Sequence, residues 1–513
     1  MKKIKKSISL AIVIALVLTL LFACAPPPPP TGPGDNTVPD VIEDDSDREG
    51  WVSFEKESFA AGSKLRIKFF NGGYGRAWID AMKTKFEADY PGVEVILTSS
   101  NKEADFTSTI STTLAGSNAD DIYICHNIPW EKLSVQSLVM NLDNLYNSVI
   151  YTDTKNDNAP IRYVDRIATS SLNGVKFNGH FYKVPEVQGA GGIAYNKGLF
   201  DANGWSIPTT YAEFVTLCQT ISGSGVKGTD GKNVVPFVWS GTEAYIWDSL
   251  VYDWWVQIAG IDEFNQFMKY EDKNMFNSAE FPALKTAWTY WYDLVAENPA
   301  FSHPESLALD NLQSNMAFAA GQAAMMPATC WIANEIGDEM LNDFSCDIGL
   351  FPTPFVPEAK KDGENNPIRV TYDLAGKDSF IIAQKGKNKL LAQEFFKWMA
   401  LEENALLFPQ NTNGLLLAIR YDFQNLIDKV ATSTWEREMF GLLQNTTRFN
   451  LYSQSPLVYS SGSPLSPYPD GNYYLEAVES YGTASPRTPD AVFNGVWTRI
   501  DREWDQMLAG VGL

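Results

Sequence analysis

The stretch VPEVQGAGGIAYNKGLFDANGWSIPTTYAEF, residues 184–214, decides the fold of this chain. Val184–Pro185 closes an extended segment, and the run Gln188–Gly192 is rich in glycine, which predicts unusual backbone torsions. The apolar residues 193–195 then predict a buried strand. This order of elements indicates a crossover, in which one domain ends near Pro185 and a second domain begins with Tyr195.

Two short helices are predicted after this strand. Asn196 can cap a first helix that runs through Phe200, before the polar residues 201–204 break it. Thr210 and Glu213 stand three residues apart, which is capping-box spacing, so each side chain can accept a hydrogen bond from the other's backbone N–H. A second helix therefore begins after Thr210.

The N-terminal half contains a strand–helix–strand pattern. Apolar and basic residues alternate over 65–69, which predicts a half-buried strand that ends at the loop Asn71–Tyr74. A helix with one apolar face follows, and residues 93–98 form a second strand. This pattern predicts parallel strands with a right-handed crossover. A further buried strand over 120–125 leads to a loop that carries Asn127 and Trp130.

Four segments resemble, in the same order, the extracellular solute-binding proteins of carbohydrate ABC transporters, the family that includes maltose-binding protein. They are AWIDAMKTKFEADYPGVEV (77–95), YNKGLF with TTYAEF (195–214), FAAGQAAMMPATCW (318–331), and residues 347–354 with 378–399. The resemblance extends from about Leu65 to Met507.

The resemblance implies an α/β fold with two lobes, each a mostly parallel sheet flanked by helices, joined by a multi-segment hinge. Residues 62–187 and 378–412 would form the N-terminal lobe, and residues 188–377 and 413–513 would form the C-terminal lobe. The chain would return to the first lobe near Tyr372–Lys377 and leave it near Asn413.

The first residues predict an exported protein. Four lysines precede an apolar run over 8–22, which is shorter than the ~20 residues of a membrane-spanning helix, so residues 1–23 read as a signal peptide. Leu21-Phe22-Ala23-Cys24 resembles the lipobox of bacterial lipoproteins, in which the Cys carries lipid. Phe22 departs from that pattern, and an ordinary signal peptide is the alternative. Residues 24–61 would form a proline-rich acidic tether.

Composition limits the classes of function. The chain has 513 residues, more than one core usually supports, and a net charge of −22, which excludes the concentrated basic surface of a nucleic-acid-binding protein. Its three histidines are far apart, so we expect no metal site, and no cofactor is indicated. Gly223, Gly225 and Gly228 match G-x-G-x-x-G, but they follow a helix rather than a strand, so the match is a coincidence.

For the four remaining cysteines we favour buried thiols, because small secreted domains need disulfides more than a chain of this size does, while disulfides stay open. They are Cys125, Cys218, Cys330 and Cys346.

The tryptophans fall into two groups. Trp78, Trp288, Trp398 and Trp504 lie on apolar helical stripes, which predicts core positions. Three others stand at or just beyond the ends of predicted strands, where α/β sheets bind ligands, and an aromatic face suits the C–H-rich face of a sugar ring. Core packing remains the alternative for each of the three. The resemblance places Trp331 at a sugar-stacking position of the family. The candidate ligand-binding residues are Trp331, Trp130, Trp239, Asn71, Tyr74, Asn127, Glu186 and Tyr372.

The resemblance implies a monomeric substrate-binding lipoprotein that captures a sugar or oligosaccharide between its lobes and delivers it to an ABC permease. The protein would lie on the extracytoplasmic face of the bacterial cell membrane, held by a lipid (palmitate) on Cys24, and would perform no bond chemistry. A surface glycoside hydrolase and a ligand-sensing partner of a membrane receptor are the alternatives.

Overall fold

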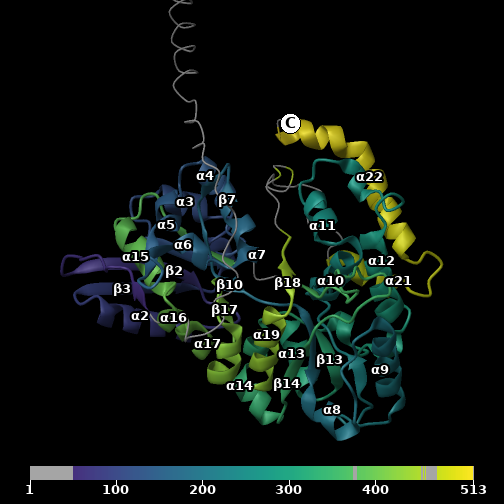
Figure 1. Cartoon of the computed structure of the whole chain (residues 1–513). Coiled ribbons are helices and arrows are strands. Elements are labelled where there is room, and N and C mark those ends of the chain that lie inside the picture. Colours follow the sequence, from purple (N-terminus) through teal and green to yellow (C-terminus); the bar gives the residue numbers. More distant parts are fainter. Residues whose placement is uncertain (1–49, 374–377, 452–454, 456, 458–470, 512–513) are drawn as a thin grey trace, which may run out of the picture. The chain divides into compact units, whose positions relative to one another are not determined.

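The computed structural model describes residues 50–373, 378–451, 455, 457 and 471–511 (Figure 1). The predicted signal peptide, Cys24 and most of the predicted tether lie outside these residues. Within the described part, no helix combines the length and the apolar character that crossing a membrane requires.

A five-stranded sheet organises the first half of the chain, and with its helices it is called the N-terminal lobe below. Its strand order is β3 (Val93–Ser100), β2 (Ser63–Phe70), β4 (Ile122–His126), β16 (Asp378–Ile382) and β9 (Val184–Pro185). β2 pairs in parallel with β3 and β4, as the strand–helix–strand pattern predicts, whereas β16 is antiparallel to both its neighbours.

Helix α2 (Ala77–Asp89) packs the apolar face that the sequence predicts against this sheet. Trp78, Ile79, Met82 and Phe86 are buried on it, and the Phe86 ring lies 5.1 Å from that of Phe395 on α15 (Lys389–Met399). A segment from the last third of the chain thus completes the core of the first lobe.

A four-stranded sheet organises the C-terminal lobe. Its order is β12 (Val235–Phe237), β13 (Ala323–Ala328), β11 (Gly192–Asn196) and β14 (Ile348–Phe351). β11 is antiparallel to both its neighbours, while β12 and β13 are parallel. Each of the two sheets therefore contains one strand that opposes the others, so both are mostly parallel.

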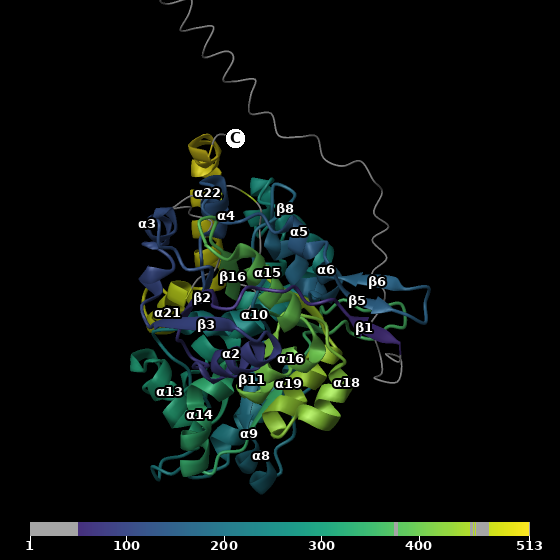
Figure 2. The ribbon, with the colours of Figure 1, turned by 90° about the vertical axis from the view of Figure 1, so that its left-hand side faces the viewer.

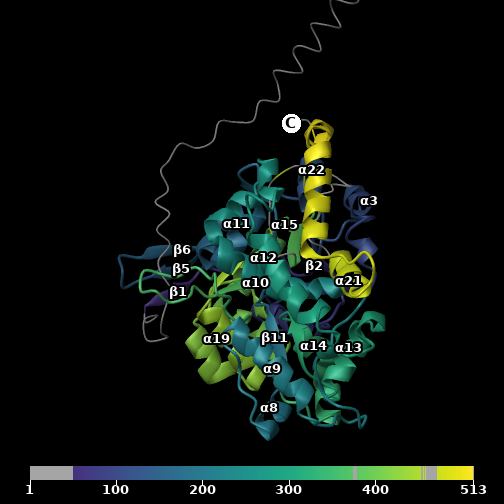
Figure 3. The same ribbon diagram turned by 90° about the vertical axis from the view of Figure 1, so that its right-hand side faces the viewer.

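Aromatic helices cover the second sheet. α10 (Asp248–Ala259) and α12 (Ala283–Trp291) pack side by side (Figure 1), and the long helix α22 (Pro489–Val511) runs beside α12 (Figure 3). The tryptophans predicted for cores, Trp78, Trp288, Trp398 and Trp504, are all buried.

The remaining helices connect these layers. In chain order they are α3 (Ile110–Ala115), α4 (Trp130–Val135), α5 (Asp143–Tyr146), α6 (Tyr163–Arg166), α7 (Thr169–Leu172), α8 (Lys197–Asn203), α9 (Tyr211–Gly223), α11 (Ile261–Phe267), α13 (Asn311–Ala319), α14 (Ile332–Asp343), α16 (Glu402–Ala405), α17 (Leu407–Gln410), α18 (Phe423–Asn425), α19 (Thr434–Gln444) and α21 (Gly471–Ser480).

The caps predicted after the first crossover are present. The Asn196 side chain accepts a hydrogen bond from Leu199 N, and Thr210 forms a reciprocal capping box with Glu213 at the start of α9. These local signals fix where α8 and α9 begin.

The glycines of the crossover serve a different purpose from the one predicted. Gly191 and Gly192 do not have positive φ. A Cβ on Gly191 would lie 2.8 Å from Ser249 Cβ, and a Cβ on Gly192 would lie 2.6 Å from Phe351 O. Glycine is needed here because the chain passes very close to its neighbours, not because of unusual torsions.

Two short strand pairs accompany the crossing segments. β10 (Val187–Gln188) pairs with β17 (Leu416–Leu417), and β15 (Val370–Tyr372) pairs with β18 (Thr447–Phe449). Gln188 Nε2 donates to Leu417 O at 2.8 Å. The Arg448 guanidinium donates to Gln188 Oε1. These bonds join segments that lie far apart in the sequence.

The folded part of the chain includes residues 51–61, which the sequence assigned to the tether. β1 (Trp51–Ser53) pairs with β5 (Val149–Asp153), which pairs with β6 (Ala159–Arg162), and the three lie side by side in Figure 2. Glu57 N also donates to Glu394 Oε1 at 2.9 Å. Residues 51–61 are therefore part of the folded body, because Trp51, Phe54 and Phe59 supply large apolar side chains that the rest of the predicted tether largely lacks.

Candidate functional site

The loop after β2 lies beside the first crossing segment. Asn71 N donates to Ser100 O at 3.0 Å, while Asn71 Oδ1 is buried with no hydrogen-bond partner among the described residues. Tyr74 Oη donates to Glu186 Oε1 at 2.7 Å. Three predicted site residues, Asn71, Tyr74 and Glu186, are thus brought to the end of β2.

Glu186 is a buried carboxyl beside a second one. It is 1% exposed, and its backbone N–H donates to Asp378 O at 3.1 Å. Burial raises the pKa of Glu186 well above its ordinary value, and the Asp378 carboxylate raises it further. Both effects favour the protonated form of Glu186, and its Oε2 has no hydrogen-bond partner in the described part of the chain.

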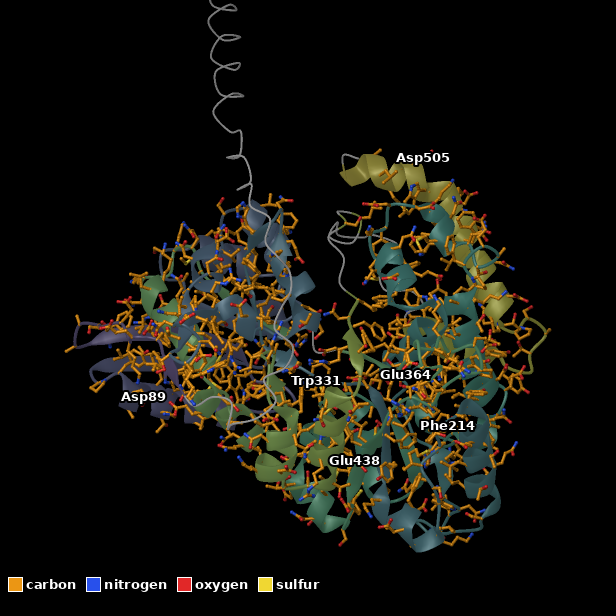
Figure 4. The ribbon with its side chains drawn as sticks, viewed as in Figure 1. Asp89, Phe214, Trp331, Glu364, Glu438 and Asp505 are labelled. Atoms are coloured by element: carbon orange, nitrogen blue, oxygen red, sulfur yellow. The ribbon has the colours of Figure 1, made fainter. Side chains whose placement is uncertain are left out.

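Trp331 lies at the N-terminal end of α14, just beyond β13 (Figure 4). Its side chain is partly exposed, unlike those of the core tryptophans. One turn further on, Glu335 Oε2 accepts from Asn311 Nδ2 at 3.1 Å. Burial raises the pKa of Glu335.

The two lobes meet at this helix end. A Cβ built on Gly73 would lie 3.2 Å from Glu335 Cγ. The loop Asn71–Tyr74 therefore passes directly against the first turn of α14, which places Tyr74 and Trp331 at the same junction.

Two further side chains of the C-terminal lobe interact electrostatically with Glu335. Burial raises the pKa of Glu243, and the carboxylates of Glu335 and Asp310 raise it further. Tyr245 is 43% exposed. Burial is the largest effect that raises its pKa, and the carboxylates of Glu243 and Glu335 raise it further. No local sequence pattern marks Glu243 or Tyr245 as a site residue. Glu335 could have been inferred, because it follows Trp331 by one helical turn.

Three predicted site residues lie deeper than the others. Trp130 is 4% exposed, with Lys183 Nζ 5.1 Å from its ring centroid, and Trp239 is 2% exposed, with its Nε1 donating to Ser302 Oγ at 3.1 Å. Tyr372 is 2% exposed and packs against Phe449. In this structure the three rings belong to cores behind the junction.

Asn127 is exposed at the end of β4 and has a φ of +54°. Asparagine tolerates this left-handed conformation better than most residues. The turn therefore leaves the Asn127 amide accessible at the edge of the N-terminal lobe.

The cysteine question is resolved for the described residues. Cys125, Cys218, Cys330 and Cys346 are free and buried, and burial raises the pKa of each thiol. In the described part of the chain, His, Cys, Asp and Glu side chains do not gather in groups of three or more that could hold a metal ion.

The junction combines aromatic faces with hydrogen-bond acceptors. Trp331 and Tyr245 supply partly exposed aromatic faces, while Asn71, Glu243 and Glu335 supply mainly hydrogen-bond acceptors. An aromatic face with polar neighbours is typical of a site that binds a ligand with both C–H and O–H surfaces.

A family model described as bacterial extracellular solute-binding protein matches residues 71–406. The match covers more than half of the chain, so the chain belongs to the bacterial extracellular solute-binding proteins. This is a family of binding proteins that work outside the cytoplasm.

Individual proteins agree with this assignment. The Multiple sugar-binding protein of Streptococcus mutans is 25% identical over 362 residues, which are 67% of this chain and 73% of that protein. The Diacetylchitobiose binding protein NgcE of Streptomyces coelicolor is 23% identical over 361 residues, which are 68% of this chain and 69% of that one.

Solved structures share the fold. RafE from Streptococcus pneumoniae, in its apo form, superposes with a TM-score of 0.61 at 17% identity, covering 88% of this chain and 100% of that one. The GacH receptor of Streptomyces glaucescens gives a TM-score of 0.60 at 14% identity, covering 87% and 99%. The predicted two-lobed α/β fold is confirmed.

Proposed function

We propose that this protein is the sugar-binding receptor of an ABC importer, which captures a saccharide between its lobes and delivers it to a membrane permease. The observation that carries the proposal is Trp331, partly exposed at the start of α14 and one helical turn before Glu335, which Gly73 of the N-terminal lobe approaches. The names of the relatives, one multiple sugar-binding and one diacetylchitobiose-binding, support a carbohydrate as the ligand.

The proposed ligand contacts divide by depth. Trp331 stacks on a sugar ring, and Asn71, Tyr74 and Asn127 meet hydroxyls from the N-terminal lobe. Glu186 fixes Tyr74 from behind. Trp130, Trp239 and Tyr372 act as the rigid wall beneath these groups, because their rings are almost fully buried.

Binding works through closure rather than chemistry. The proposed boundaries, with residues 62–187 and 378–412 in one lobe and 188–377 and 413–513 in the other, make the crossing segments a hinge. A ligand favours the closed state only to the extent that it binds that state more tightly, so contacts shared by both lobes drive closure. The protein acts as a monomer, needs no cofactor, and leaves the sugar unchanged.

A saccharide panel tests the proposed function. We expect at least one neutral mono- or oligosaccharide to raise the melting temperature and to bind by calorimetric titration, with the sugar recovered intact afterwards. Hydrolysis of the bound sugar would contradict the receptor role. Failure of every saccharide in a broad panel would contradict sugar binding itself.

We also propose that the protein is tethered to the outer face of the cell membrane by lipid on Cys24. The support is the lipobox-like sequence Leu21-Phe22-Ala23-Cys24 and the proline-rich residues that follow it. We expect Cys24→Ser to release the protein into the medium or to leave it uncleaved. A mutant that still partitions into detergent after normal processing would contradict the anchor.

A further inference from the structure

We propose that the junction selects saccharides that supply hydrogen-bond donors, with a protonated amino sugar favoured and sugar acids rejected, and that Glu335 is the discriminating residue. This inference rests on the proposed function. It concerns five residues of the C-terminal lobe, called the Glu335 cluster: Glu243, Tyr245, Asn311, Asn315 and Glu335.

The two carboxylates of the cluster lack a basic partner. Among the described residues, neither Glu335 nor Glu243 forms an ion pair with a lysine, arginine or histidine. The Glu335 carboxylate is held instead by the side chains of Asn311 and Asn315. These two amide donors oppose the effect of burial on the Glu335 pKa and favour its charged form, which attracts a cationic ligand group and repels an anionic one.

The amides that hold Glu335 leave further acceptors unused. Asn315 is 1% exposed, and its Oδ1 is buried without a hydrogen-bond partner among the described residues; the same holds for Asn311 Oδ1. Both amides donate their N–H groups to the Glu335 carboxylate. The amide groups that stay unpaired in the cluster are therefore hydrogen-bond acceptors. Because buried acceptors are costly when unpaired, they call for a ligand that donates.

The helix ends beside the cluster do not supply an anion site. Helix N-termini attract negative charge, but here both nearby ends already have a carboxylate. Asp310 caps α13, where its Oδ1 accepts from Gln313 N at 2.8 Å, and Glu335 lies in the first turn of α14. The two helices pack against each other, so a sugar carboxylate would meet these acids rather than free N–H groups.

Aromatic faces next to the cluster provide the place for the ring. Tyr245 is an exposed residue of the 3-10 helix Ala244–Trp247, and Trp331 precedes α14. A sugar stacked on Trp331 lies one helical turn from Glu335, so a ring substituent reaches the carboxylate. Opposite it stands Gly73 of the N-terminal lobe, which has no side chain that could screen the charge.

Matched sugars that differ in one substituent test this selection. The first set is galactose, galactosamine and galacturonic acid. The second set is cellobiose, its diamino analogue and cellobiouronic acid. The third set is the neutral sugar that binds best in the panel above, with its amine and its acid. We expect the acid of the bound set to bind at least about tenfold more weakly than its neutral counterpart, and the amine to bind most tightly.

Variants identify the responsible group. Glu335→Gln keeps the shape and removes the charge, so we expect the discrimination against the acid to fall about tenfold while the neutral sugar binds almost as before. Glu339→Gln, an exposed change on the same helix, is the control and should leave the ratio unchanged. If Glu335→Gln melts much lower, Glu243→Gln tests the same charge from another element.

The outcomes separate the two proposals. A sugar acid that binds as tightly as its neutral counterpart, or a ratio unchanged in both Glu335→Gln and Glu243→Gln, overturns the selection while the receptor function stands. A panel in which only sugar acids bind has the same consequence. A panel in which no saccharide binds overturns both.

Discussion

At the scale of single residues, the junction depends on carboxyl groups that are kept away from water. Glu186 accepts from Tyr74 and lies beside Asp378, with no surrounding charge sufficient to keep its pKa low. Glu335 is held by amides rather than by a cation. Such groups cost stability in their charged form, which is common where a site is arranged for a ligand.

Glu186 makes the stability of the protein depend on pH. The pKa of Glu186 in the folded protein is raised above the ordinary value of 4.5. Its contribution to the free energy of unfolding is therefore complete below pH 4.5 and is lost as pH rises through the folded pKa. We expect the stability of Glu186→Gln relative to wild type to increase as pH rises above 4.5, because glutamine does not ionise. Urea unfolding across this range measures it.

A constant difference between the two proteins across that range would contradict the buried, protonated state of Glu186. Exposed Glu339→Gln serves as the control, because its side chain lies in solvent and should show no such trend.

Trp331 is the residue on which ligand affinity should depend most. We expect Trp331→Ala to weaken sugar binding by ~3 kcal/mol, which combines lost stacking and lost apolar burial and equals about one hundredfold in affinity. Calorimetric titration measures the affinity, and thermal melting of the same variant measures the fold.

The matched control is Trp398→Ala, in a fully buried position of the other lobe. That variant should lose ~3–5 kcal/mol of folding stability instead. If Trp331→Ala lowers the melting temperature strongly while affinity is unchanged, Trp331 is a core residue and the proposed site is elsewhere.

At the scale of elements, the crossing segments are held by close backbone approach. β11 starts at Gly192, directly against β14, and Gln188 joins β17 and Arg448. A hinge built from short strand pairs can bend at the residues between the pairs while the paired residues stay together.

Gly192→Ala tests this arrangement. The added Cβ would lie 2.6 Å from Phe351 O, so β11 and β14 must separate, and we expect a loss of ~1–3 kcal/mol in the free energy of unfolding. The comparison is Gly223→Ala at the end of α9, where a Cβ meets nothing within 4 Å. There the change should be neutral or stabilising by ~0.4–1 kcal/mol. Equal effects of the two substitutions would refute the close-approach explanation.

At the scale of the whole molecule, the proposed function requires the lobes to move. The approach of Gly73 to Glu335 and the bond from Ala168 N to Ala418 O, 3.0 Å long, join segments assigned to different lobes. Because each lobe has its own sheet, closure can proceed by bending the crossing segments while each sheet keeps its strand pairing.

We expect small-angle scattering to give a smaller radius of gyration at saturating sugar than without sugar. The physical reason is that contacts to both lobes are complete only when the lobes approach each other. Trp331→Ala at the same sugar concentration is the control and should stay near the unliganded radius. Identical radii for wild type with and without bound sugar would rule out closure, though not binding.

Much of the fold could be predicted because its signals are local. The alternation over 65–69, the apolar face of α2 and the capping pair Thr210–Glu213 each depend on neighbours within a few residues, and each is present as predicted. The position of Trp331 just beyond a strand also followed from the order of elements. Such patterns survive in any tertiary arrangement because they reflect the periods of strands and helices.

What the sequence alone determined is therefore the class of protein and the sheets, while the strand ends at which a ligand binds stay a prediction. Only the tertiary structure decided how deep each side chain lies and which distant residues meet. Trp130 and Trp331 both follow strands, yet one is covered by neighbours from other elements and the other is not. Gly73 meets Glu335, and Glu186 meets Asp378, across separations that no local pattern records. Burial and charge environment are sums over residues brought together by folding, so they cannot be read from any single stretch of the chain.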